Sequence, residues 1–525
     1  MNRYSKLFFV LLIASSLFSC DLDRFPPNAI ALDQSLQSMS DAKNWDNGVF
    51  AFFRGRQYGI FTVAQDIQVD KLNATRAFGG RNIALHTWTG LSASDVTISN
   101  IWQEYYRALM NVNHLINSYP HLIASGAYVV NMPGDTAEEN AAATAANRAL
   151  LDRFLGNAHF ARAFYYNELA LRWSVSYDPA TADTELSVPI VTEFNPINRP
   201  ARATLREVYQ FILSDIAEAH RLLAHVPGAP GATRFNRDVV TALEARVRLY
   251  MQDWTGAFQA ANSLITSGRY PLETTVAGLE NLWVHDRSDE VIMQSHTTAA
   301  ELPNASGLTT NNNIYLNFTV VTGHFSPDFI PSQWVVDKFD ANDIRRAVYF
   351  SNADSILIEG ATHPGIYRVT KFRGNPAIPN SHIGGGAVPA PQANAQAPKV
   401  FRIAEMYLIA AEAAFRLGNE TNALTALNTL RQARGLNAVT ASGDALFQEI
   451  KDERFRELAF EGFRLFDLRR WGLGFERREP QNPSVLTAGA DFQFKRVEAD
   501  NPRFVWGIPT NDIINNPNLV QNRGW

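Results

Sequence analysis

Three glutamates in one short stretch have the spacing that chemistry on a sugar could use. The stretch is ERFRELAFEGFRLFDLRRWG, residues 453–472, and it carries Glu453, Glu457 and Glu461 at intervals of four. Carboxyl groups roughly 5–5.5 Å or 6.5–9.5 Å apart perform retaining or inverting glycoside hydrolysis. Residues four apart on a helix lie about 6 Å apart. Distance alone therefore permits a catalytic pair.

The arginines in the same stretch argue for a structural role. Permanent guanidinium charges lower the pKa of neighbouring carboxyl groups, whereas a general acid needs a raised pKa. Phenylalanines and a leucine supply an apolar face for packing. We interpret the stretch as an ionic lock that holds a helix against its neighbours. The arginines are Arg454, Arg456, Arg464, Arg469 and Arg470.

Other catalytic or metal-binding motifs are absent from the sequence. It contains no G-x-x-x-x-G-K-[ST], H-E-x-x-H or G-x-S-x-G motif, and its 11 histidines are scattered. The acidic group Asp337, Asp340, Asn342 and Asp343 lacks the glycine and terminal glutamate of an EF-hand loop, so we expect a solvated helix end there. We therefore expect no enzymatic activity, no cofactor and no metal.

Composition and the N-terminus narrow the class of protein. The 525 residues are 46% hydrophobic and 19% charged, with a net charge of −5, which indicates a globular chain without a basic nucleic-acid footprint. Arg3 and Lys6 precede a short apolar run and Cys20, the only cysteine. This pattern predicts a lipoprotein signal peptide over 1–19 and acylation of Cys20; an ordinary signal peptide is the alternative. The run is too short to span a bilayer.

The rest of the chain has the periodicity of amphipathic helices and a weak internal repeat. A D-x-x-E pattern at Asp135–Glu138 predicts a helix running to about Trp173, with a break near Gly156. A second helix is predicted from about Thr204 to Leu223. Two segments share small or apolar residues at offsets of 0, 12, 16 and 19, which is typical of tetratricopeptide-type helical hairpins. These residues are Ala245, Ala257, Ala261 and Leu264 in one segment, and Ala411, Ala423, Leu427 and Leu430 in the other.

Two regions do not follow this pattern. Periodicity fades over 268–398, and its last part, 374–398, holds four glycines and five prolines. We interpret 268–398 as either a linker or a surface that faces a ligand or partner. Pro509 and Pro517 exclude a long helix near the end of the chain, so 473–525 is predicted to be an extended tail along the body.

Several of these stretches resemble the SusD/RagB family of Bacteroidetes outer-membrane nutrient-binding lipoproteins. The resemblance is strongest in RIAEMYLIAAEAAFRLGNETNALTALNTLRQARGL (402–436) and the glutamate–arginine stretch that follows it. Supporting stretches are LGNAHFARAFYYNELALRW (155–173), WTGAFQAANSLITSGRYPL (254–272), PSQWVVDKFDANDIRR (331–346) and the closing IPTNDIINNPNLVQNRGW.

The resemblance implies a mainly α fold with four tetratricopeptide-like helix pairs. We expect one domain over 20–525, with the scaffold at about 100–267 and 399–472 and a large irregular ligand-facing portion at about 268–398. The family implies a surface-exposed, lipid-anchored outer-membrane protein that captures oligosaccharides for a TonB-dependent, SusC-like transporter. A RagB-like peptide-binding protein is the first alternative, and a surface glycoside hydrolase is a less favoured one.

Ligand contacts are expected where aromatic rings and polar side chains mix in irregular segments, because sugars need both. The segments 66–100 and 310–330 qualify. The candidate ligand-binding residues are Arg81, Trp88, Asn312, Tyr315 and Phe325. Four other tryptophans lie beside repeat or motif positions and are predicted to pack in the core: Trp254, Trp283, Trp334 and Trp471.

Overall fold

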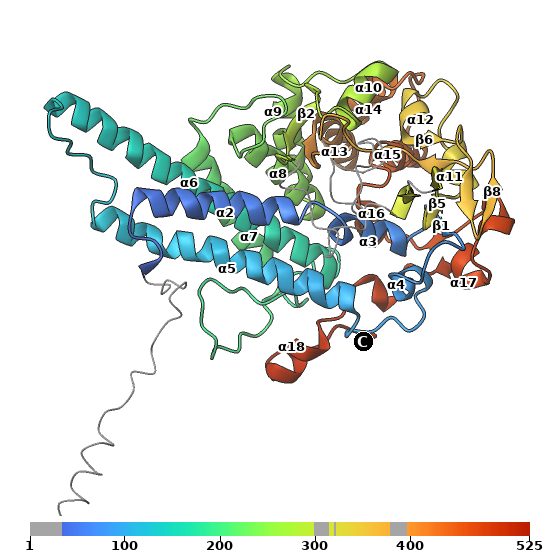
Figure 1. Cartoon of the computed structure of the whole chain (residues 1–525), viewed down its shortest axis with the longest axis horizontal. Coiled ribbons are helices and arrows are strands. Elements are labelled where there is room, and N and C mark those ends of the chain that lie inside the picture. Colours follow the sequence, from blue (N-terminus) through green and yellow to red (C-terminus); the bar gives the residue numbers. More distant parts are fainter. Residues whose placement is uncertain (1–33, 299–313, 320–321, 379–395) are drawn as a thin grey trace, which may run out of the picture.

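The fold is mainly α-helical, as expected. A computed structural model describes residues 34–298, 314–319, 322–378 and 396–525. The signal peptide over 1–19, Cys20 and Asn312 lie outside these ranges. Within the described ranges, no helix is both long enough and apolar enough to cross a bilayer. Long helices form one side of the molecule, and short strands with loops form the other (Figure 1).

Seventeen α-helices lie within the described ranges, and most are short. Their bounds are α2 Met39–Gly55, α3 Ile60–Gln68, α4 Ile83–Thr87, α5 Val96–Ala124, α6 Ala137–Trp173, α7 Leu205–Leu223, α8 Arg237–Tyr250, α9 Trp254–Thr266, α10 Val276–Trp283, α11 Gln333–Asp337, α12 Ile344–Tyr349, α13 Ile403–Arg416, α14 Glu420–Ala433, α15 Gly443–Glu457, α16 Arg464–Arg470, α17 Ala490–Gln493 and α18 Thr510–Asn515.

The first helical layer consists of α2, α5, α6 and α7, which pack against one another (Figure 1). It begins well before residue 100, where the scaffold was predicted to start. Helix α7 has the predicted bounds because Thr204 and Glu207 form a reciprocal capping box. Helix α6 begins one residue later than the D-x-x-E pattern suggested, since its capping box joins Thr136 and Glu139.

Helix α6 also runs unbroken through Gly156, where a break was predicted. A Cβ atom at this position would lie 2.9 Å from Cγ of Leu223 and 3.0 Å from Cβ of Leu222, both on the neighbouring α7. The glycine therefore permits two helices to approach closely and does not end one of them.

The second helical layer contains the two predicted repeats, α8–α9 and α13–α14. All eight offset residues are buried, as expected for positions where paired helices cross. Helix α13 packs against α9 as well as against α14, so the two repeats lie side by side although 268–398 separates them in sequence. The irregular region is therefore an insertion between adjacent repeats.

Short strand pairs, antiparallel except for the parallel β4–β7 pair, organise the insertion and tie it to the scaffold. Strand β2 (Val291–Gln294) pairs with β10 (Lys399–Arg402), which leads directly into α13. Strand β1 (Leu72–Ala74) pairs with β5 (Phe329–Pro331). Four further strands form one sheet of order β3-β4-β7-β8: β3 Phe318–Thr319, β4 His324–Phe325, β7 Ile356–Ile358 and β8 Ala361–His363. Two more pairs are β6 (Phe350–Ser351) with β9 (Arg368–Val369), and β11 (Phe475–Glu476) with β12 (Arg496–Val497) in the C-terminal tail.

The C-terminal tail lies along the body, as predicted, but with short helical turns. The indole of Trp506 is fully buried and donates to the side chain of Gln68 at 2.9 Å. Trp173 donates to the carbonyl of Gly507 at 2.8 Å, and Asn522 donates to the carbonyl of Trp173 at 2.8 Å. The final residues thus close the first helical layer.

The close approach at Gly156 gives a test of this packing. Replacing Gly156 with Ala raises helix propensity, but the added methyl group overlaps Leu223, and overpacking typically costs about 1–3 kcal/mol. We expect a net loss of unfolding free energy in denaturant titration. The matched control is Gly55→Ala at the end of α2, where a Cβ meets nothing within 4 Å; it should stabilise by about 0.5 kcal/mol. A stabilised Gly156→Ala variant would contradict the packing.

Candidate functional site

The three glutamates of the opening stretch do not form a catalytic pair. Helix α15 ends at Glu457, and the chain turns away after it, with Phe460 and Gly462 in left-handed backbone conformations at φ of 65° and 82°. Glu461 therefore lies in a turn beyond the helix, and the expectation of one helical stripe of three carboxylates is wrong. Glu453 and Glu457 are both fully buried.

Glu457 is the centre of an arginine network. Its carboxylate accepts hydrogen bonds from Arg402 at 2.7 Å, from Arg345 at 2.9 Å and from Arg434 at 2.9 and 3.0 Å. Burial by itself would raise the pKa of Glu457, but Arg434, Arg402 and Arg345 hold it well below the usual value. This is the opposite of the shift that a general acid requires.

The network extends to the neighbouring carboxylates and joins distant parts of the chain. Glu453 accepts from Arg345 at 2.6 Å, and its pKa is also lowered by the arginines against the effect of burial. Glu290 accepts from Arg434 at 2.7 Å. Arg345 also pairs with Asp343 at 2.7 Å, so this aspartate is buried and not part of a solvated helix end. The lock predicted from the local arginines is real, but most of its cations come from elsewhere in the chain.

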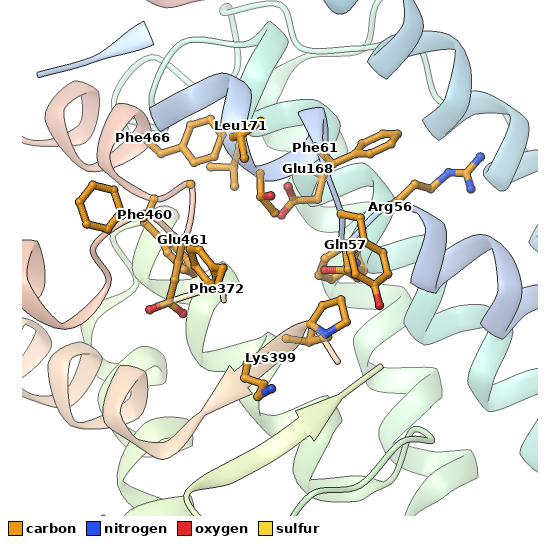
Figure 2. Close-up of a pocket in the computed structure, with 18 of the residues that line it drawn as sticks. Arg56, Gln57, Phe61, Glu168, Leu171, Phe372, Lys399, Phe460, Glu461 and Phe466 are labelled. Atoms are coloured by element: carbon orange, nitrogen blue, oxygen red, sulfur yellow. The ribbon is translucent and has the colours of Figure 1, made fainter. Parts of the chain in front are cut away.

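Beside this network lies a central cavity, which Figure 2 shows in close-up. It encloses about 980 Å³ of empty space, part of which is open to solvent. Phe460 and Glu461 line one side, Arg56 and Gln57 the other, and Lys399 lies below them (Figure 2). Further aromatic walls are Phe61, Tyr250, Trp283, Tyr315, Phe372 and Phe466. The mixed aromatic and polar lining is typical of small-molecule sites.

The charged groups on the cavity wall are already paired. Glu168 accepts from Arg172 at 2.6 Å, and Arg246 donates to both oxygens of Glu405 at 2.7 Å. Lys399 forms an ion pair with Asp286. Glu461 accepts from Arg402 at 2.6 Å and from Lys371 at 2.7 Å. These ion pairs leave little charge for a ligand to neutralise.

Four neutral polar groups on the same wall have no hydrogen-bond partner among the described residues. The hydroxyls of Tyr250 and Tyr315, the indole N–H of Trp283 and the amide oxygen of Gln396 are buried and make no hydrogen bond with the described residues. Burial raises the pKa of Tyr315 well above its usual range, so its hydroxyl stays protonated and able to donate. A buried polar group without a partner costs about 1–3 kcal/mol, which a bound ligand can recover.

Of the described candidate ligand residues, only Tyr315 lines the cavity. Arg81 is half exposed and paired with the buried Asp328, near the β1–β5 pair. Phe325 lies in β4 with the guanidinium of Arg368 3.8 Å from its ring centroid. Neither residue lines the cavity, so the predicted set does not converge on one site.

Trp88 is a packing residue in this structure. Its side chain is 7% exposed, its indole N–H donates to the carbonyl of Gln68 at 2.8 Å, and its ring meets Phe504 edge-on at 5.1 Å. The interpretation of 66–100 as an irregular ligand surface missed that its first ten residues are all buried. Trp283 is buried in the core, as predicted, but it also lines the cavity with an unpartnered N–H, a role that the sequence did not indicate.

No cluster of three or more histidines, cysteines or acidic residues in the described part of the chain is placed to hold a metal ion. Fold and site together define a tetratricopeptide-like helical protein with an internal aromatic cavity and locked carboxylates.

Comparisons with known proteins identify the family. A model described as "SusD family" matches residues 345–525, and one described as "Starch-binding associating with outer membrane" matches residues 32–249. SusD-like protein P38 of Formosa agariphila is 25% identical over 420 residues, covering 70% of this chain and 73% of the relative. The chain belongs to the SusD/RagB family.

Solved structures share the fold over nearly the whole length. A SusD superfamily protein from Bacteroides thetaiotaomicron is 23% identical with a TM-score of 0.71, covering 92% of this chain and 99% of that one. A structure titled "Laminarin binding SusD-like protein" is 20% identical with a TM-score of 0.65, covering 93% and 100%.

The arginine network predicts a large effect of one neutralising substitution. Glu457→Gln leaves three buried guanidinium groups undercompensated and should lower the unfolding free energy by about 3–5 kcal/mol at pH 7. Because the folded pKa of Glu457 is depressed, its contribution is complete above the ordinary glutamate pKa and is lost as pH falls below it. The difference between variant and wild type should therefore narrow in acid, as measured by denaturant titration across pH.

The control for this experiment is Glu218→Gln, which removes an exposed carboxylate paired with Arg221. It should change stability by at most about 0.5 kcal/mol. Equal effects of the two substitutions would show that the buried network does not hold the fold.

Proposed function

We propose that the protein is a non-enzymatic, lipid-anchored outer-membrane protein that captures neutral oligosaccharides in the central cavity and delivers them to a TonB-dependent, SusC-like transporter. The observation that carries the sugar assignment is the chemistry left over in the cavity. Its charges are paired with one another, while aromatic faces, three neutral donors and one acceptor remain. Aromatic faces cover the C–H surfaces of a sugar, and neutral donors and acceptors satisfy its hydroxyls.

Family membership supports the same proposal. A relative in the fold comparison is described as laminarin-binding, and one matching model describes starch binding associated with the outer membrane. Delivery to a transporter, surface exposure and the lipid anchor rest on the resemblance and on the signal-peptide pattern ending at Cys20.

Two alternative functions remain distinguishable by experiment. A RagB-like protein would bind extended peptides, whose backbone amides also suit neutral donors. A glycoside hydrolase would need a carboxyl group with a raised pKa in the cavity, whereas the described glutamates there accept from arginine or lysine. Calorimetry with neutral oligosaccharides and mixed peptides, followed by analysis of the recovered ligand for cleavage, separates the three.

Tyr315→Phe tests the cavity directly. Loss of one neutral hydrogen bond to a bound sugar should weaken affinity by about 2–10-fold, since such a bond contributes about 0.5–1.5 kcal/mol. Folding should be unaffected, because the hydroxyl has no partner in the chain. The matched control is Tyr165→Phe, which removes another unpartnered buried hydroxyl that does not line the cavity. If the Tyr315→Phe variant binds the sugar with unchanged affinity, the binding site is not in this cavity.

The anchor has its own test. Cys20→Ala in the full-length chain should abolish incorporation of labelled fatty acid and shift the protein from the membrane to the soluble fraction, because Cys20 is the only cysteine available for acylation. A Ser19→Ala variant keeps a small residue before the cysteine and should remain membrane-bound. Membrane retention of the Cys20→Ala variant without label would contradict lipid anchoring.

A further inference from the structure

A second, separate hollow lies on the surface formed by α11, α15 and the β11–β12 pair. We call it the tryptophan groove; it is lined by Trp334, Trp471 and neighbouring residues and encloses about 1070 Å³, part of it open to solvent. It shares no lining residue with the central cavity. Its aromatic floor includes Phe455, whose ring lies 5.2 Å from that of Trp334, and Phe475. Both tryptophans were predicted to be core packing residues, but both are only partly buried.

The groove differs from the cavity in its charges. Three ion pairs lie on its wall: Asp70 with Arg464, Asp452 with Lys338, and Glu498 with Arg496. The remaining charged groups are Lys451, Arg478 and Glu476, and none of them forms an ion pair with another described residue. The groove therefore has an excess of positive charge in a chain whose net charge is −5.

The two unpaired cations are held in place by aromatic rings. The guanidinium of Arg478 lies 5.5 Å from the ring centroid of Trp334, and the ammonium of Lys451 lies 5.0 Å from that of Phe447. Cation–π contact orients a charge without consuming its hydrogen-bond donors. Arg478 makes no hydrogen bond to the described residues and is exposed, so its N–H groups are available to an anion.

We propose that the tryptophan groove binds a carboxylate-bearing segment of a polysaccharide, such as a run of uronic acid residues. Arg478 and Lys451 would contact the uronate carboxylates. Glu476 would accept hydrogen bonds from sugar hydroxyls, and the exposed parts of Trp334 and Trp471 would contact the sugar rings. This inference rests on the proposed saccharide function but assigns a different site and a different ligand charge from the neutral cavity.

The test compares two tetrasaccharides by calorimetry on the chain from Asp21 onward, which retains every described residue. The ligands are tetragalacturonate, which is anionic, and laminaritetraose, which is neutral. The double variant Arg478→Gln/Lys451→Gln should bind tetragalacturonate at least tenfold more weakly and laminaritetraose unchanged. Raising the salt concentration should weaken the binding of the anionic ligand only, because screening acts on exposed charges. Arg478→Lys with native Lys451 should retain part of the affinity.

Matched controls separate this proposal from the cavity. Arg221→Gln removes an exposed arginine outside the groove and should change neither affinity. Tyr315→Phe should weaken the binding of laminaritetraose but not the binding of tetragalacturonate. The groove assignment is overturned if tetragalacturonate does not bind, if the double variant binds it normally, or if equimolar sulfate displaces it fully, which would indicate a simple anion site. If tetragalacturonate binds but laminaritetraose does not, the cavity proposal is overturned and the groove proposal stands.

Discussion

The fold depends on the requirement that charges buried in its centre neutralise one another. Burying a single guanidinium or carboxylate without a partner is prohibitive, and a buried pair is tolerated only when its geometry and hydrogen bonds are complete. Around Glu457 this requirement is met by arginines from three separate parts of the chain: Arg345 in the insertion, Arg402 at the start of α13 and Arg434 at the end of α14. None of these segments can move far without exposing a charge to an apolar surrounding. The network therefore fixes the insertion to the scaffold more specifically than apolar packing could.

This fixation explains how an irregular region can form one wall of a cavity. The repeats α8–α9 and α13–α14 pack directly together, so the insertion between them adds no length to the helical layer. It instead lies beside the layer, and Trp283, Tyr315 and Phe372 of the insertion line the cavity together with Phe61 and Tyr250 of the helices. A rigid helical layer and an anchored irregular wall keep the cavity open without a ligand, which reduces the ordering cost of binding.

The scaffold could be predicted from sequence because its signals are local. The spacing of small residues predicted both repeats, and the helix predicted from about Thr204 to Leu223 matches the bounds of α7. The ionic lock was also visible, since arginines surround the glutamates in the sequence. Its true partners were not, because Arg345, Arg402 and Glu290 lie far away in the chain. The turn that takes Glu461 out of the helix was missed, because Phe460 adopts a left-handed conformation there that its residue type does not favour.

Candidate ligand residues were also hard to predict, because their surroundings are formed by residues distant in the chain. An aromatic residue in an irregular segment has the same sequence signature whether its ring is covered or free. Trp88 is covered by Phe475 and Phe504 from the distant tail, whereas Trp283 ends a helix yet borders the cavity. Only the tertiary arrangement separates the two cases: Tyr315 lines the cavity and Phe325 does not, although the sequence does not distinguish them.

The position of the C-terminal tail has a consequence for biogenesis. Trp506 and the residues after it close contacts with Gln68 and Trp173, which lie in the first third of the chain. The first helical layer therefore lacks part of its core until the last segment has been synthesised. The layer therefore stays incomplete while the chain emerges from the N-terminus onward and closes only when the last segment is available. Fragments lacking the final twenty residues leave Trp173 without these partners and present an unfinished surface to proteases.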